Sequence, residues 1–126
     1  MVFSMNEDAR NCLVEVIGAL IDAGDEPGRC ELLDFQQRTL AVLKFSRPSA
    51  GTPRDGTLNF NRMEQDPAAR ASGLAVMARI VDGDGTEVFR CDVSDERGNG
   101  VIKLNSNQIT AGGPIRIDTF SISYPA

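Results

Sequence analysis

The chain has 126 residues, of which 41% are hydrophobic and 25% charged, a composition that is ordinary for one globular domain. Its net charge of −5 argues against binding to a phosphate backbone, and its lack of His removes the commonest general base and metal ligand. No stretch approaches the roughly 20 apolar residues that cross a bilayer. We therefore expect neither a nucleic-acid nor a membrane partner.

The first element that the sequence predicts is a helix over about residues 4–23. Ser4 and Glu7 have the S-x-x-E spacing of a capping box, and Gly24 can take the left-handed conformation that ends a helix. Polar residues form a narrow stripe along this segment: Asp8, Asn11, Glu15, Gly18 and Asp22. Apolar residues fill the rest: Ala9, Cys12, Leu13, Val16, Ile17, Leu20 and Ile21. So wide an apolar face predicts a helix that the domain mostly covers.

Beyond Gly24 the apolar residues recur with the period of two that is typical of strands. The candidate strands are 30–35, 39–45, 57–61, 74–81, 87–93, 101–104 and 114–124. Asp82–Gly85 predicts a hairpin turn. The apolar set of the last strand changes parity, which predicts a β-bulge near Asp118-Thr119. The polar and turn-forming segments 46–56 and 62–73 are expected to be mobile loops.

These elements predict one domain over residues 1–126, with the helix at about 4–23 and a β-sandwich at about 29–125. About seven short strands separated by turn signals indicate a mainly β fold. We expect an immunoglobulin-like antiparallel β-sandwich with one N-terminal α-helix.

The candidates for chemistry are few, and each has a structural explanation. Cys12, Cys30 and Cys91 are widely spaced among apolar residues, which is typical of unpaired, buried cysteines in a reducing compartment. Asp82–Gly85 begins like a calcium loop, but Glu87 and Val93 stand where an EF-hand needs Gly and Glu. Adjacent carboxylates lie in the first helical turn or in polar loops. We therefore expect no catalytic residue, no cofactor and no metal site, and a protein that is not an enzyme.

Three segments resemble a group of small tailed-bacteriophage proteins: ARNCLVEVIGALIDAG (9–24), ASGLAVMARIVDGDGTEVFRCDV (71–93) and IKLNSNQITAGGPIRIDTFSISYPA (102–126). Members of that group share a helix of the type ARN…ALxxxxDAG, a hairpin ASGTAxxxRIxDxDGTxVxxGDV and a closing LNxxxIxAGGxVxVxSFxIxxPA. The chain departs from the group in having Cys91 where Gly is usual and more charge around 62–70 and 94–99. The shared motifs are structural, so the resemblance indicates a fold and a genomic setting.

The resemblance implies a virion structural protein that assembles in the cytoplasm of the bacterial host. We expect a head decoration, or cement, protein at the head surface, which binds and stabilises the shell of the major capsid protein as a homo-oligomer such as a trimer. Weak contacts repeated over a lattice would give a large total stabilisation. Two alternatives stay open: a protein of the tail or adsorption apparatus, and a small module that binds carbohydrate or calcium.

Two segments are candidates for the partner interface. Met1, Val2, Phe3 and Met5 form a short apolar arm before the helix, which could order on contact with a neighbour or pack locally. Arg47 and Arg54 in the loop 46–56 could meet an acidic patch or be solvated.

Overall fold

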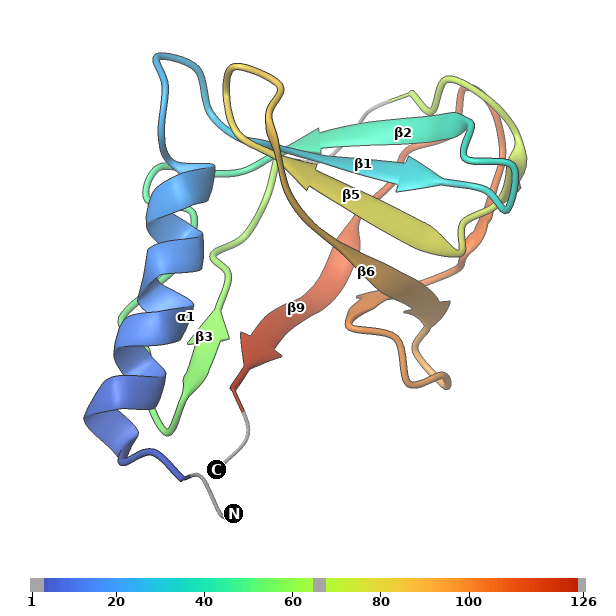
Figure 1. Cartoon of the computed structure of the whole chain (residues 1–126). Helices are drawn as coiled ribbons and strands as arrows, with labels where there is room; N and C mark the ends of the chain where they lie inside the picture. The colour runs from blue at the N-terminus through green and yellow to red at the C-terminus, as the bar shows by residue number, and fades with distance from the viewer. Residues whose placement is uncertain (1–3, 65–67, 125–126) are drawn as a thin grey trace.

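The computed structural model describes residues 4–64 and 68–124, which form one helix and nine strands. Seven strands form one sheet in the order β2-β1-β5-β6-β7-β9-β3, and β4 pairs with β8 (Figure 1). The helix is α1 (Glu7–Ile21). The strands are β1 (Arg29–Leu33), β2 (Thr39–Lys44), β3 (Thr57–Asn59), β4 (Gly73–Leu74), β5 (Met77–Val81), β6 (Glu87–Asp95), β7 (Ile102–Leu104), β8 (Gln108–Ile109) and β9 (Ile117–Ser123).

The mainly β fold with one N-terminal helix is confirmed, but its sheet is mixed and not wholly antiparallel. β6 and β7 are parallel, with Val93 opposite Ile102. The short connection can turn back because side chains of β6 bind its backbone. Ser94 Oγ accepts the Gly100 N–H at 2.9 Å, and Asp92 Oδ1 accepts the Val101 N–H at 3.0 Å.

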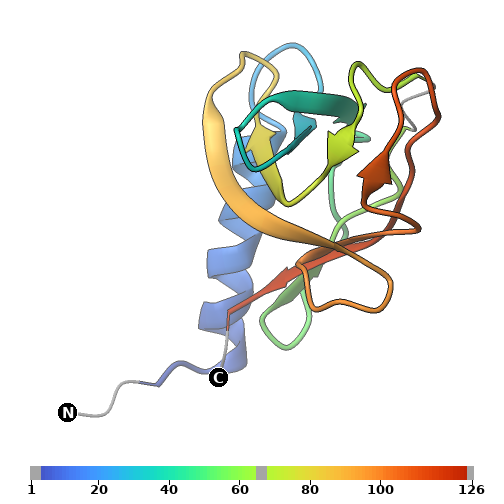
Figure 2. The ribbon, with the colours of Figure 1, turned by 90° about the vertical axis from the view of Figure 1, so that its right-hand side faces the viewer.

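The sheet curls around one apolar core. Figure 2 shows β6 as the long curved strand between the β1-β2-β5 part of the sheet and the part that contains β9. The segment that follows the edge strand β3 meets the other edge strand, β2, since the Glu64 N–H donates to the Lys44 carbonyl at 3.0 Å. Between them, the ring centroid of Phe60 lies 5.5 Å from that of Phe45 and 4.3 Å from that of Phe120. The core thus joins residues far apart in the chain.

The predicted bulge in the last strand is confirmed. Lys103 of β7 pairs with Thr119 of β9, whereas the next residue, Leu104, pairs with Ile117, so one residue of β9 is skipped. This shift lets Phe120 lie in the core although Ile115, on the opposite parity, is buried too. A strand with side chains of both parities facing inward needs such an extra residue.

The start of α1 differs from the prediction, and its end agrees with it. Asn6 is the N-cap, and its side chain accepts the Ala9 N–H at 2.9 Å. The predicted capping box of Ser4 and Glu7 was therefore wrong, because Asn6 is an equally good cap closer to the apolar segment. Glu7 instead accepts the Asp55 N–H at 3.2 Å. Gly24 has a φ of 96°, as the predicted helix stop requires.

Candidate docking surface

α1 turns most of its apolar residues toward solvent. Leu13, Val16 and Leu20 are 45%, 55% and 50% exposed. Cys12 and Ala19, which lie beside them on the helix, are exposed as well. We call Cys12, Leu13, Val16, Ala19 and Leu20 the apolar face of α1. The expectation that the domain mostly covers the apolar residues of the helix holds for Ile21 but was wrong for this face, and the expectation that Cys12 is buried was wrong too.

The domain packs instead against another side of α1, where Val14, Gly18 and Ile21 are buried. Asn11 and Asp22 of the polar stripe lie on this side, whereas Asp8 and Glu15 are exposed. Asn11 Oδ1 accepts the Gly56 N–H at 2.8 Å. Gly18 is buried beside β3, where a Cβ would lie 3.5 Å from the Leu58 side chain. The Asp22 carboxylate accepts both the N–H and the hydroxyl of buried Ser49, at 3.1 and 3.2 Å. Specific hydrogen bonds and a close helix–strand approach therefore orient α1 with its apolar face outward.

The loop 46–56, expected to be mobile, is held against the end of α1. The Arg47 guanidinium donates to four backbone carbonyls where the chain leaves α1, those of Asp22, Gly24, Asp25 and Glu26. A cation suits this place, because the C-terminal end of a helix carries partial negative charge. Arg47 thus has a role within the chain, and its contact with an acidic partner stays a prediction.

The other predicted interface residues lie near the opposite end of α1 or outside the described residues. Arg54 is exposed and begins a tight turn in which Asp55 and Gly56 have φ of 50° and 70°. Met5 is half-buried, and its carbonyl accepts a hydrogen bond of 3.3 Å from Arg10. Met1, Val2 and Phe3 fall outside the described residues. Among the described residues, no contact joins Arg54 or Met5 to the apolar face.

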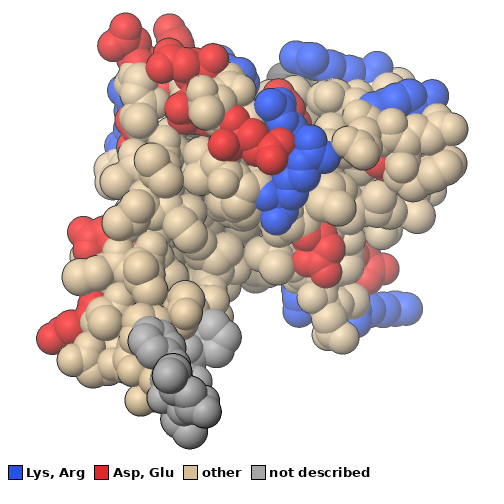
Figure 3. All heavy atoms as spheres, viewed as in Figure 1, with Lys and Arg blue, Asp and Glu red and all other residues tan. Residues whose placement is uncertain are grey.

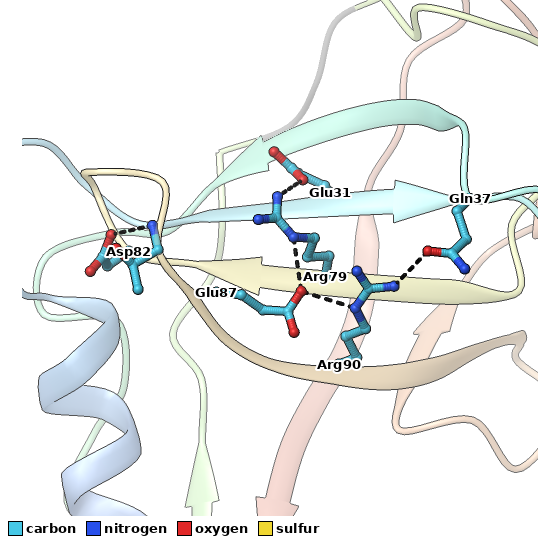
Figure 4. Close-up of polar contacts among 7 residues, drawn as sticks. Glu31, Gln37, Arg79, Asp82, Glu87 and Arg90 are labelled. Carbon is cyan, nitrogen blue, oxygen red and sulfur yellow. Dashed lines mark hydrogen bonds and ion pairs between the residues drawn. The ribbon is translucent and has the colours of Figure 1, made fainter.

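The outer face of the sheet is polar, in contrast to the apolar face of α1. A row of side chains crosses β1, β5 and β6: Glu31, Arg79, Glu87 and Arg90, followed by Gln37 at the β1–β2 turn (Figure 4). Each of the three ion-pair distances is 2.9 Å. Hydrogen bonds from Arg90 and Arg79 lower the pKa of Glu87. Acids and bases on this face pair with one another, which is typical of a solvated surface.

The Asp82–Gly85 segment forms the predicted hairpin turn between β5 and β6. Asp82 Oδ1 accepts the N–H groups of Asp84 and Thr86, both at 2.9 Å (Figure 4 shows Asp82 at this turn). Its carboxylate therefore stabilises the turn itself. Among the described residues, no group of three or more Asp, Glu, Cys or His is placed to hold a metal ion.

One cavity of about 470 Å³ is lined by residues that follow β3 and by residues at the start of β9: Phe60, Asn61, Arg62, Met63, Arg116, Ile117 and Phe120. The described lining residues include two basic ones, Arg62 and Arg116, and none that is acidic. A pair of carboxylates for acid–base chemistry is thus not found among those residues.

The cysteines differ strongly in their surroundings, and all three are free. Cys12 is exposed on the apolar face of α1, whereas Cys30 is buried in the core. Burial raises the pKa of the Cys91 thiol to about 12 and that of Cys30 well above its usual value. Reactivity toward thiol reagents is therefore expected at Cys12 first.

The space-filling view shows a mainly uncharged surface over α1, with acidic groups along its edge and beyond its end (Figure 3). Within the ranges 4–64 and 68–124, no helix has the length and apolar character needed to span a membrane. No protein-family model, curated protein or solved structure was found to match the chain. The apolar face of α1 is accordingly the candidate site that the structure itself supplies.

Proposed function

We propose that this chain is a bacteriophage head decoration protein, which adheres to the shell of the major capsid protein through the apolar face of α1. The sequence resemblance supports the phage setting. The observation that carries the adhesive role is the exposure of Leu13, Val16 and Leu20, each close to one half, on one side of a single helix. A contiguous exposed apolar surface of this kind marks a site of interaction.

The size of this surface suits a contact that is repeated many times. Full burial of a Val or Leu side chain contributes about 1.5–3 kcal/mol, so covering the exposed halves of three such residues contributes roughly 2–4 kcal/mol. That is less than the ~4–15 kcal/mol that association costs in lost freedom of motion. A homo-oligomer would present several copies of the face to the lattice, and its later contacts would form at high effective concentration.

Cryo-electron microscopy of particles made from the genome that encodes this chain tests the proposal. We expect density for the domain on the head surface, with α1 against the capsid protein. Density confined to the tail would favour the tail protein, and absence from the particle would refute a virion role.

A pair of variants tests the surface. Val16→Asp places a charge in the middle of the apolar face and is expected to abolish head occupancy. Phe35→Asp is the matched control, because Phe35 is 80% exposed in the turn between β1 and β2 and lies outside α1. Equal occupancy for Val16→Asp and the parent protein would show that α1 is not the adhesive element.

A further inference from the structure

We infer that the apolar face of α1 receives an amphipathic helix of a different polypeptide, whose apolar stripe is bordered by Lys or Arg. This inference rests on the proposed function in one respect, that the face is a docking surface. The shape of the face indicates that the partner is a helix. The charges beside the face indicate that Lys or Arg borders the partner's apolar stripe.

The spacing of the exposed residues is that of a helix–helix seam. Leu13, Val16 and Leu20 alternate steps of three and four residues, as the inward positions of a coiled coil do. At about 100° per residue, the apolar face with Cys12 and Ala19 covers an arc of roughly 120°. A strand or a flat surface would meet only part of such an arc, whereas a second helix can follow it over its length.

The relief of the face also fits knobs-into-holes packing. Cys12, Glu15, Val16 and Ala19 line a shallow depression of about 270 Å³. The small side chains of Cys12 and Ala19 form part of its lining, and Leu13 and Leu20 are exposed on the same helix. A Leu or Ile side chain of a partner helix would fill such a hole between neighbouring turns.

The charges around the face select the partner. The exposed charged side chains of α1 are all acidic: Asp8 and Glu15 lie beside the apolar face, and Glu7 accepts the Asp55 N–H. Arg10, the one basic residue of α1, is half-buried and donates to the Met5 carbonyl. Beyond the helix, Asp25 and Glu26 are exposed too.

This acidic border makes the other occupants unfavourable. A second copy of α1 would bring a second set of acids and no exposed base, and like charges at close range repel. An anionic membrane surface attracts Lys and Arg and would repel the same acids. A helix edged with Lys or Arg would instead pair with Glu15 while its apolar stripe covers Val16.

Two synthetic helical peptides test the inference with the full chain. Both carry the same Leu and Ala seam, one bordered by Lys and the other by Glu, and binding is measured by fluorescence anisotropy. We expect the Lys-bordered peptide to bind about tenfold more tightly, since several weak ion pairs differ in sign between the two complexes. We also expect the preference to shrink between about 50 mM and about 500 mM salt, where screening becomes strong.

Variants locate the effect on the apolar face. Val16→Asp should abolish binding of both peptides, and Glu15→Lys should reduce the preference for the Lys-bordered peptide at least about threefold. Phe35→Asp and Glu64→Lys are the controls, because each changes an exposed residue outside α1 in the same chemical way. Circular dichroism of every variant establishes that it is folded.

Three results would overturn the inference. Equal binding of both peptides, or binding of neither, would contradict a partner helix bordered by Lys or Arg. Sedimentation velocity that shows a dimer of the chain, lost in Val16→Asp, would assign the face to a second copy. Binding to phospholipid vesicles that is lost in Val16→Asp would assign it to a membrane. Failure of the proposed function is seen separately, as absence of the chain from phage heads.

Discussion

Replacement of Gly83 by Ala tests how the β5–β6 hairpin holds the end of α1. A Cβ atom at Gly83 would lie 1.9 Å from the carbonyl oxygen of Glu26 and 2.7 Å from its carbonyl carbon. Both atoms belong to the backbone of the turn between α1 and β1. No side-chain rotation can relieve this overlap, so one of the two turns has to move.

The expected loss of stability follows from this geometry. Extra methyl groups in well-packed sites cost about 1–3 kcal/mol, and an overlap with backbone places Gly83→Ala in the upper part, about 2–3 kcal/mol. With an unfolding entropy of about 2.1 cal/mol/K per residue, a chain of this length loses about 4 °C in Tm per kcal/mol. We therefore expect Tm to fall by about 8–12 °C.

Thermal unfolding followed by circular dichroism measures this change, and Gly51→Ala is the matched control. A Cβ at Gly51 would have no neighbour within 4 Å, so the same substitution there meets open space. It is expected to leave Tm unchanged or to raise it slightly, because Ala restricts the unfolded chain. A Gly83→Ala protein that unfolds within about 2 °C of the parent would refute the packing argument.

Three further predictions concern the reactivity of the thiols, the loop 46–56 and the thermal stability at acid pH. Near pH 8, a thiol reagent should label Cys12 rapidly and Cys91 slowly, because burial holds the pKa of Cys91 at about 12. Below that value the thiolate fraction of Cys91 rises about tenfold per pH unit. Three rapidly reacting thiols in the folded protein would contradict the structure. Asp22→Ala leaves the Ser49 N–H without its acceptor, while the Ser49 hydroxyl keeps the Gly18 carbonyl at 3.4 Å. This change should destabilise the protein by about 1–3 kcal/mol and speed proteolysis within 46–56. The exposed control Asp25→Ala should change stability by less than about 0.5 kcal/mol in denaturant titrations. The backbone N–H and side chain of Arg38, with the N–H of Gln36, hold the pKa of Asp34 below its usual value. Their contribution is complete above that usual value and is lost as the pH falls through the lowered one, so the Tm difference between the parent and Asp34→Asn should be largest near neutral pH and should vanish in acid; a difference that is the same at every pH would argue against this role.

Several features of the fold were predictable because they depend on neighbours in the chain. The helix stop at Gly24 and the hairpin at Asp82–Gly85 depend on local backbone preferences. The bulge in β9 followed from the parity of its apolar residues alone. The parallel pairing of β6 with β7 could not be predicted from the sequence. It needs the hydroxyl of Ser94 to close a loop whose residues have no strong sequence pattern. The two-residue strands β4 and β8 are too short to show a period.

The candidate site shows the same division between local and distant information. The sequence alone determined that α1 is amphipathic, with an apolar side and a stripe of polar and small residues. Which residues of α1 meet the domain was decided by partners far along the chain: Gly56 for Asn11, Leu58 for Gly18 and Ser49 for Asp22, on the side where Val14 and Ile21 are buried. Hydrophobicity favours burial of the apolar side, but these specific bonds and the close approach at Gly18 form only once the loop 46–56 and β3 lie beside the helix. Tertiary structure therefore left the apolar face of α1 in solvent, where a partner can reach it.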